Sequence, residues 1–256
     1  MGAWWNQVYP IASWMTRNIL TPSFSFHQFY RCKMIKVENL TKSFTLHHQD
    51  SVKLAVFENV SFEIAPGECV ALSGPSGTGK STMLRLIYGN YIADHGKIFI
   101  QNIDIASSSP REIISLRKSV IGYVSQFLRV VPRVSTLDVV AETLLHAGHA
   151  QAQAYERAHE ILDQLQISEK LRTLSPMTFS GGEQQRVNIA RVMCHDFPVL
   201  LLDEPTASLD EHNKHIVLDL IAGARDRGAT ILGIFHDHDS RKRICTRSID
   251  FEALIG

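Results

Sequence analysis

Short apolar runs alternate along the chain with amphipathic stretches of helix length, beginning at about residue 34. This alternation is typical of an α/β domain, in which helices cover a sheet. The runs that predict strands are IKVENL, AVFENVSFEI, ECVALSG, KIFIQ, VIGYVSQ, PVLLLDE and TILGIFH. No internal repeat or low-complexity tract interrupts them. The pattern therefore predicts an α/β sheet core.

Between residues 125 and 191 the pattern becomes helical. The segment STLDVVAETLLHA begins with Ser135 three residues before Asp138, which is a start that resembles a capping box. The segment AYERAHEILDQLQI repeats apolar residues at helical spacing. In LRTLSPMTFSGG, Pro176 and the glycines indicate the end of one helix and the start of the next. These features predict a helical subdomain at about residues 127–182.

The first 33 residues differ in composition from the remainder. All three tryptophans lie there, and no acidic residue precedes Glu38. One interpretation is a membrane-interface or targeting segment. The other, which we favour because polar residues break the apolar run, is a disordered extension or a non-native start before Met34. We therefore predict a folded domain at residues 34–241 and a divergent C-terminal tail at residues 242–256.

Composition narrows the classes of partner. Lys and Arg number 26, as do Asp and Glu, and this balance argues against a nucleic-acid partner. The cysteines form no CxxC pair, which favours free thiols of a reducing compartment over a zinc site. The apolar runs are shorter than the roughly 20 residues that span a bilayer. We expect a cytoplasmic protein without a membrane span, which would serve a membrane only through a partner.

The most specific motif is GPSGTGKST at residues 74–82, which satisfies G-x-x-x-x-G-K-[ST] between a predicted strand and a predicted helix. Its glycines let backbone N–H groups turn toward phosphate oxygens, and the helix N-terminus favours an anion. Lys80 is expected to reach the β- and γ-phosphates, and the Ser81 hydroxyl to bind Mg²⁺. The alternative is a chance match in a glycine-rich turn. The predicted nucleotide contacts are Gly74, Pro75, Ser76, Gly77, Thr78, Gly79, Lys80, Ser81 and Thr82.

Polar residues that end apolar strands complete the predicted chemistry. In VLLLDEPTASLD, Asp203 would hold the metal through water and Glu204 would orient or deprotonate the attacking water. Gln126 is predicted to bind metal and water, and His236 to contact the γ-phosphate. Alone, each is more often an ordinary strand-end polar group. A metal site at residues 236–239 is a weaker alternative, because alternate strand residues point apart. The predicted catalytic residues are Glu204, His236, Gln126 and Lys80, and the predicted metal ligands are Ser81, Gln126 and Asp203.

Together GPSGTGKST, Gln126, FSGGEQQR, LLLDEP, SLD and His236 resemble the nucleotide-binding domain of ATP-binding-cassette (ABC) ATPases. The resemblance covers about residues 34–241 and implies a P-loop NTPase fold, with a RecA-like core, an antiparallel β subdomain and a helical subdomain. It also implies that two such domains close head to tail on two molecules of ATP with Mg²⁺.

The same resemblance assigns the motif FSGGEQQR, which puts a serine and two glycines at a predicted helix start. Ser180, Gly181 and Gly182, with Glu183 beside them, would contact the γ-phosphate of ATP on the other protomer. Asp210 would lie near the partner's phosphate loop. Phe44 in LTKSF would stack on adenine, although an isolated Phe after a short strand is usually core. Departures such as Phe179 and Glu183, for the common Leu and Gln, remove no catalytic group, so the resemblance implies hydrolysis.

Within this family, VSQFLRVVPRVSTLDVV, FSGGEQQRVNIAR, LLLDEPTASLD and GIFHD resemble the PhnL-type ATP-binding subunits of the bacterial carbon-phosphorus lyase system. That resemblance implies a homodimer or heterodimer acting with the lyase core proteins and a sister ABC subunit in phosphonate catabolism. The chain would supply ATP hydrolysis during synthesis of ribose 1-methylphosphonate 5-triphosphate. Two alternatives stay open: the ATPase subunit of a membrane transporter, and a scaffold that binds ATP without hydrolysing it.

Overall fold

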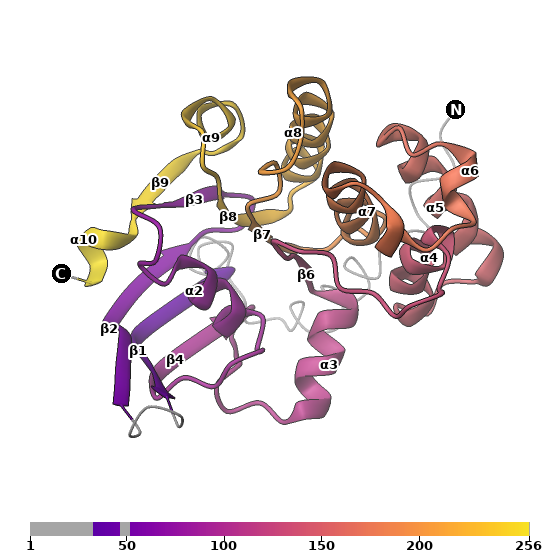
Figure 1. Ribbon diagram of the computed structural model, residues 1–256. Coiled ribbons are helices and arrows are strands. Elements are labelled where there is room, and N and C mark those ends of the chain that lie inside the picture. The colour runs from indigo at the N-terminus through magenta and orange to yellow at the C-terminus, as the bar shows by residue number, and fades with distance from the viewer. Residues whose placement is uncertain (1–32, 47–51, 256) are drawn as a thin grey trace, which may run out of the picture. The chain divides into compact units, whose positions relative to one another are not determined.

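The computed structural model describes residues 33–46 and 52–255. The predictions for the N-terminal extension fall, except for Lys33, outside these residues. The α/β class is confirmed: one parallel and one antiparallel sheet form the body of the domain, and a group of helices lies at the far end of the parallel sheet (Figure 1).

The central sheet has five parallel strands in the order β6-β7-β8-β3-β9. Its strands are β3 Cys69–Ser73, β6 Ile121–Val124, β7 Val199–Asp203, β8 Thr230–Ile234 and β9 Arg247–Asp250. Every residue of β6, β7 and β8 is buried, as expected for strands covered on both faces. The carboxyl ends of these strands share one edge, and the predicted catalytic residues follow them in the sequence.

Side chains alternate between the two faces of this sheet. On β7, Val199 and Leu201 pack into one apolar core, and Leu200 and Leu202 pack into the other. The first core also contains the buried face of α2 (Lys80–Ile87) and the antiparallel sheet. The second contains apolar side chains of the helical subdomain and of α8 (Glu211–Asp226). The parallel sheet is therefore the middle layer of the domain.

The second sheet is antiparallel, in the order β2-β1-β4-β5. Its strands are β1 Ile35–Leu46, β2 Val52–Ile64, β4 His95–Ile100 and β5 Ile103–Asp104. The register of β1 against β2 shifts between Val37 and Ser43, and Asn39 has a φ of 48°. The inward side chains of β1, Ile35, Val37 and Leu40, are buried against α2 and the central sheet. This sheet is the predicted antiparallel β subdomain.

The helical subdomain comprises α4 Thr136–His146, α5 Gln151–Gln164, α6 Glu169–Arg172, the 3₁₀ helix η2 Pro176–Thr178 and α7 Gly181–Met193. Ser135 caps α4 as predicted, because its Oγ accepts from the backbone N–H of Asp138 at 3.1 Å. The amide of Thr136 donates to the carbonyl of Leu174 at 2.9 Å. That bond joins the start of α4 to the loop between α6 and η2.

The remaining helices are α3 Pro110–Ser119, α9 His238–Ile244 and α10 Phe251–Ile255. The structure differs from the predicted boundary at residue 241, because β9 lies beyond it and pairs with β3 in the central sheet. Phe251 of α10 is also completely buried. The sequence pattern missed β9 because only one of its four residues is buried. Among the described helices, none has both the length and the apolar character to span a membrane.

Candidate functional site

The loop at residues 74–79 joins the end of β3 to the start of α2, as the sequence predicts. Residues 74–77 are exposed, and residues 78–82 are half-buried. Gly79 is the N-cap of α2 and has a φ of 96°, which favours glycine. A Cβ at Gly79 would lie 2.6 Å from Cγ1 of Val56, so the contact with β2 also excludes a side chain. Loop conformation and packing therefore both require the glycine.

Lys80 places a positive charge inside this loop. Its Nζ donates to the carbonyl oxygens of Gly74, at 2.8 Å, and of Pro75, and to Oγ1 of Thr78 at 3.3 Å. Burial lowers the pKa of Lys80, and the carboxylates of Glu204 and Asp203 oppose that shift. A cation surrounded by turned backbone and next to a helix N-terminus fits the phosphates of a nucleotide.

Ser81 and Asp203 form the second part of the site. Ser81 Oγ donates to Oδ1 of Asp203 at 2.8 Å, and the Tyr123 hydroxyl donates to Oδ2 at 3.1 Å. Asp203 is completely buried at the end of β7. Burial raises its pKa, while the bonds from Ser81 and Tyr123 lower it. A hydroxyl and a carboxylate held together supply the oxygen ligands that Mg²⁺ prefers, so the residues fit the predicted metal.

Glu204, Gln126 and His236 meet although they follow three different strands. Glu204 Oε1 lies 2.6 Å from Nε2 of His236, and Gln126 Nε2 donates to Oε2 of Glu204 at 3.2 Å. Glu204 has a φ of 54°, a conformation that costs about 1–3 kcal/mol for a residue other than glycine. Its backbone N–H is held by the carbonyl of Ile234 at 3.1 Å. This carboxylate is suited to orient water or accept its proton.

Two residues that connect α7 to this cluster were not predicted. Gln185 is buried, and its Nε2 donates to the carbonyl of Pro205 at 3.1 Å. Asn188 is also buried and donates to the carbonyl of Ser125 at 2.6 Å. Polar residues on the buried face of a helix were the available signal, because buried amides require partners. These bonds connect α7 to the backbone beside both Glu204 and Gln126.

The serine and glycines of FSGGEQQR lie at the N-terminus of α7. Ser180 is the N-cap: its Oγ accepts from the Glu183 backbone N–H at 3.4 Å, and Oε2 of Glu183 accepts from the Ser180 backbone N–H at 2.9 Å. Gly181 has open space where a Cβ would point, whereas a Cβ on Gly182 would lie 3.0 Å from the Ser208 carbonyl oxygen. Ser180 and Glu183 therefore make their cap bonds with each other, not with the phosphate loop.

Asp210 and Phe44 lie outside the cluster around Glu204. Asp210 is the N-cap of α8, and its Oδ1 accepts from the backbone N–H of Asn213 at 2.9 Å. Phe44 is half-buried on β1, where it meets Tyr91 edge to face at 5.3 Å and lies under the ammonium group of Lys42. An aromatic face that is only half-buried is compatible with the predicted stacking on adenine. The structure places each residue without testing its role.

The alternative metal site at residues 236–239 is not supported by their contacts. His236 pairs with Glu204, whereas Asp237 caps α9 and lies 3.2 Å from Nζ of Lys214. Across residues 33–46 and 52–255, no group of three or more histidine, cysteine, aspartate or glutamate side chains converges as a metal site.

The comparisons with known proteins agree on one family. The family model described as "ABC transporter" matches residues 57–207. The chain is 36% identical over 210 residues to the lipoprotein-releasing system ATP-binding protein LolD of Bacteroides thetaiotaomicron, which covers 82% of this chain and 93% of LolD. It is 34% identical over 206 residues to the macrolide export ATP-binding/permease protein MacB of Campylobacter fetus, covering 80% of this chain and 32% of MacB.

Among solved structures, the chain is similar to the dimeric, post-hydrolysis state of the ATP-binding cassette MJ0796 bound to ADP and Pi. The TM-score is 0.78 at 29% sequence identity, and the match covers 85% of this chain and 95% of MJ0796. These relatives do not confirm the finer resemblance to PhnL. With the phosphate loop, the Ser81–Asp203 pair and the Glu204 cluster in one fold, the chain belongs to the ABC transporter family, as an ATP-binding cassette domain.

Proposed function

We propose that this chain is the ATP-hydrolysing subunit of a membrane ABC transporter, bound to the cytoplasmic side of its permease. As an ABC cassette it binds ATP and Mg²⁺, and ABC cassettes dimerise, as MJ0796 does in its dimeric structure. Support for the transporter role comes from relatives named for lipoprotein release and macrolide export. The chain matches 93% of the length of LolD and 32% of the length of MacB.

A surface beside the catalytic cluster supports a protein partner. Four large apolar side chains are exposed on two loops, the one before α4 and the one that contains η2 before α7: Phe127, Val131, Leu174 and Met177. We call them the apolar loop surface. The Thr136 bond to the Leu174 carbonyl connects the two loops. Exposed apolar groups gathered in this way are typical of an interface with another protein.

The contact between Gln126 and Glu204 carries the proposal. Phe127 is 71% exposed and directly follows Gln126, whose Nε2 lies 3.2 Å from the Glu204 carboxylate. A permease segment that binds Phe127 therefore lies one residue from a group that contacts the proposed base. Movement of that loop would change the position of Gln126 relative to Glu204, which couples the partner to hydrolysis.

Hydrolysis by this cluster is tested with Glu204→Gln. Replacing the proposed base removes general-base assistance, which typically contributes about 10²–10⁴-fold, so the ATPase rate should fall by at least about 100-fold. ATP binding should be retained, because Lys80 and the phosphate loop are unchanged. Glu211→Gln, which alters an exposed carboxylate at the first residue of α8, is the matched control. If wild type hydrolyses ATP no faster than Glu204→Gln, the chain is a scaffold and not a motor.

The partner is tested with the same variant. Slow hydrolysis should trap the closed complex, so affinity purification of Glu204→Gln with Mg-ATP should recover an integral-membrane permease, identified by mass spectrometry. The phosphonate role predicted from the sequence is the rival hypothesis, and it requires soluble carbon-phosphorus lyase proteins instead. The names of the relatives favour the transporter. Recovery of lyase proteins without a permease would overturn the proposal.

The apolar loop surface is tested by introducing a negative charge. Val131→Asp and Leu174→Asp should abolish permease recovery while leaving the basal ATPase rate unchanged, since neither side chain is part of the catalytic cluster. Ile92→Asp is the matched control, because Ile92 is apolar and 82% exposed outside the two loops. Equal permease recovery by all three variants would show that the partner binds elsewhere.

A further inference from the structure

Two cysteine thiols lie in contact between the central sheet and α9. Cys69 is the first residue of β3 and is completely buried, whereas Cys245 follows α9 and is half-buried. Their sulfur atoms are 3.7 Å apart. The backbone around them is held close, because the Thr246 N–H and hydroxyl donate to the Cys69 carbonyl at 2.7 and 2.9 Å. Only a small approach of the sulfurs separates this pair from disulfide contact, which needs about 2.05 Å.

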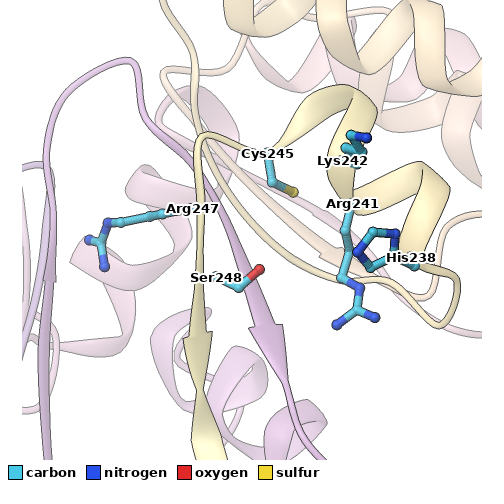
Figure 2. A pocket seen from close by; sticks show the side chains of 6 residues that line it. All are labelled: His238, Arg241, Lys242, Cys245, Arg247 and Ser248. Carbon is cyan, nitrogen blue, oxygen red and sulfur yellow. The ribbon is translucent and has the colours of Figure 1, made fainter.

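A cationic pocket of about 380 Å³ opens beside Cys245. Its lining residues are His238, Arg241, Lys242, Cys245, Arg247 and Ser248, and Figure 2 shows them on α9, β9 and the connection between the two. The lining contains no acidic side chain. Arg247 is paired with Glu68 at 2.9 Å, so Arg241 and Lys242 supply the positive charge available to a ligand. The Nε of Arg241 is buried without a hydrogen-bond partner.

The surroundings of the two thiols shift their pKa values in opposite directions. The Cys69 thiol donates to the Cys245 sulfur, and this bond lowers the pKa of Cys245, as do the positive charges of Arg241 and Arg225. The same bond, together with burial, raises the pKa of Cys69. Because the thiolate is the nucleophile, these opposite shifts favour Cys245 over Cys69 as the attacking sulfur.

We propose that Cys245 is a site of thiol–disulfide exchange with anionic low-molecular-weight disulfides such as glutathione disulfide, and that Cys69 resolves the mixed disulfide. The Cys245 thiolate attacks the disulfide RSSR, forms Cys245–S–SR and releases RS⁻. Cys69 then gives its proton to the released RS⁻, and its sulfur attacks the Cys245 sulfur, which forms the Cys69–Cys245 disulfide and releases a second RS⁻. The protein pair is oxidised by two electrons, and RSSR is reduced to two thiols. Arg241 and Lys242 bind the carboxylates of the incoming disulfide.

The location connects this site to the elements around the catalytic cluster. Cys69 begins the strand that leads to the phosphate loop, and Cys245 follows the helix that begins two residues after His236. A bond between them would tie these two elements together. The other described cysteine, Cys194, is buried on α7's C-cap, and burial raises its pKa to about 12, so it should not react.

The test uses the full chain with Cys32→Ser, because Cys32 lies outside the described residues. The protein is incubated with glutathione disulfide at neutral pH, quenched with acid and analysed by intact mass and peptide mapping. The expected product has lost two hydrogens and contains a Cys69–Cys245 cross-linked peptide, with Cys194 still reduced. A Cys69→Ser variant should stop at the mixed disulfide on Cys245. A protein that remains reduced, or that is modified mainly at Cys194, would overturn the proposal.

The role of the pocket is tested by comparing two probes. Glutathione disulfide is anionic, whereas bis(2-hydroxyethyl) disulfide is neutral. The double variant Arg241→Gln/Lys242→Gln should react about 3–10-fold more slowly with the anionic probe, because local positive charge raises the concentration of an anion. With the neutral probe the rate should fall by less, because only the loss of the Arg241 charge that favours the Cys245 thiolate acts there. Arg243→Gln, whose guanidinium pairs with Asp219 outside the pocket, is the matched control. Equal slowing with both probes would show that the cations do not select the reagent.

Discussion

Two helix N-termini, those of α2 and α7, were predicted to contact phosphate, yet they are built differently. The N-cap of α2 is Gly79, which has a positive φ and provides no side-chain hydrogen bond. The N-cap of α7 is Ser180, which forms a complete capping box with Glu183. The first helix start therefore leaves its backbone donors without a side-chain cap, while the second satisfies two of them within the chain.

The N-terminus of α2 is therefore a complete anion site, whereas the N-terminus of α7 is only half of one. At α2 the ammonium of Lys80 lies inside the loop, so charge and backbone donors act together on a phosphate. At α7 the nearest charge is the Glu183 carboxylate, whose pKa is lowered by its bonds with Ser180. A carboxylate opposes an approaching phosphate. We therefore expect α2 to bind ATP within one protomer, and α7 to contact ATP only when a second protomer supplies it.

The largest expected effect is that of Lys80→Ala, which tests the anion site at the start of α2. Hydrogen bonds that involve charged groups contribute about 1.5–3 kcal/mol each, so ATP should bind about 10–100-fold more weakly. Isothermal titration of Glu204→Gln protein with Mg-ATP measures this without turnover. Lys97→Ala, on the exposed part of β4, is the matched control. An unchanged affinity in Lys80→Ala would remove the phosphate-loop assignment.

Ser180→Arg tests the α7 half. The substitution removes the cap and fills the space before α7 with a long side chain, so ATP-dependent dimers should weaken by about tenfold or more, equivalent to at least about 1.4 kcal/mol. ATP binding by the monomer should not change, because Ser180 does not contact the phosphate loop. Analytical ultracentrifugation with Mg-ATP, in the Glu204→Gln background, gives the dimer fraction. Normal dimers in this variant would contradict the contact across protomers.

The contrast between the two helix starts also shows what the sequence can predict. The motif at residues 74–82 predicted both the phosphate loop and the strand and helix on either side of it, because the strand, the glycines, the lysine and the helix are contiguous in the sequence. The meeting of Gln126, Glu204 and His236 followed from the rule that parallel strands end at one edge. For the α7 start, the spacing of Ser180 and Glu183 also fits a capping box, a signature that our sequence analysis did not use and that the structure shows.

Residues far apart in sequence account for the features that were missed. Tyr123 is an apolar-looking strand residue until the fold places its hydroxyl 3.1 Å from Asp203. Gln185 and Asn188 gain their roles from backbone carbonyls on other elements. The residues of β9 are mostly exposed and do not alternate, so the sequence did not predict a strand there. The segment is part of the sheet because it pairs with β3. Each of these depends on a tertiary contact, which local pattern does not encode.

Glu183→Gln should change ATP-dependent dimerisation less than Ser180→Arg does, and in the opposite direction. Glutamine can keep the bond to the Ser180 amide through its carbonyl oxygen, but it removes the negative charge beside the proposed γ-phosphate. Charges at a helix terminus contribute about 0.3–1 kcal/mol, so ATP-dependent dimers should become about two- to fivefold tighter. Glu211→Gln, at the start of α8, is the matched control for loss of a first-turn carboxylate. Weaker dimers in Glu183→Gln alone would mean that the carboxylate assists closure.

The smallest effects distinguish the two glycines of α7. Gly181→Ala should raise the free energy of unfolding by about 0.5–1 kcal/mol, because alanine favours helix and its Cβ meets open space. Gly182→Ala should raise the free energy of unfolding by less, because the Cβ of the alanine would lie 3.0 Å from the Ser208 carbonyl oxygen. Urea denaturation of both variants measures the difference. If Gly181→Ala is more stable than wild type yet forms fewer ATP-dependent dimers, folding does not require glycine at this position and the contact with ATP does. If it is more stable and dimerises normally, the α7 start contacts ATP through other residues.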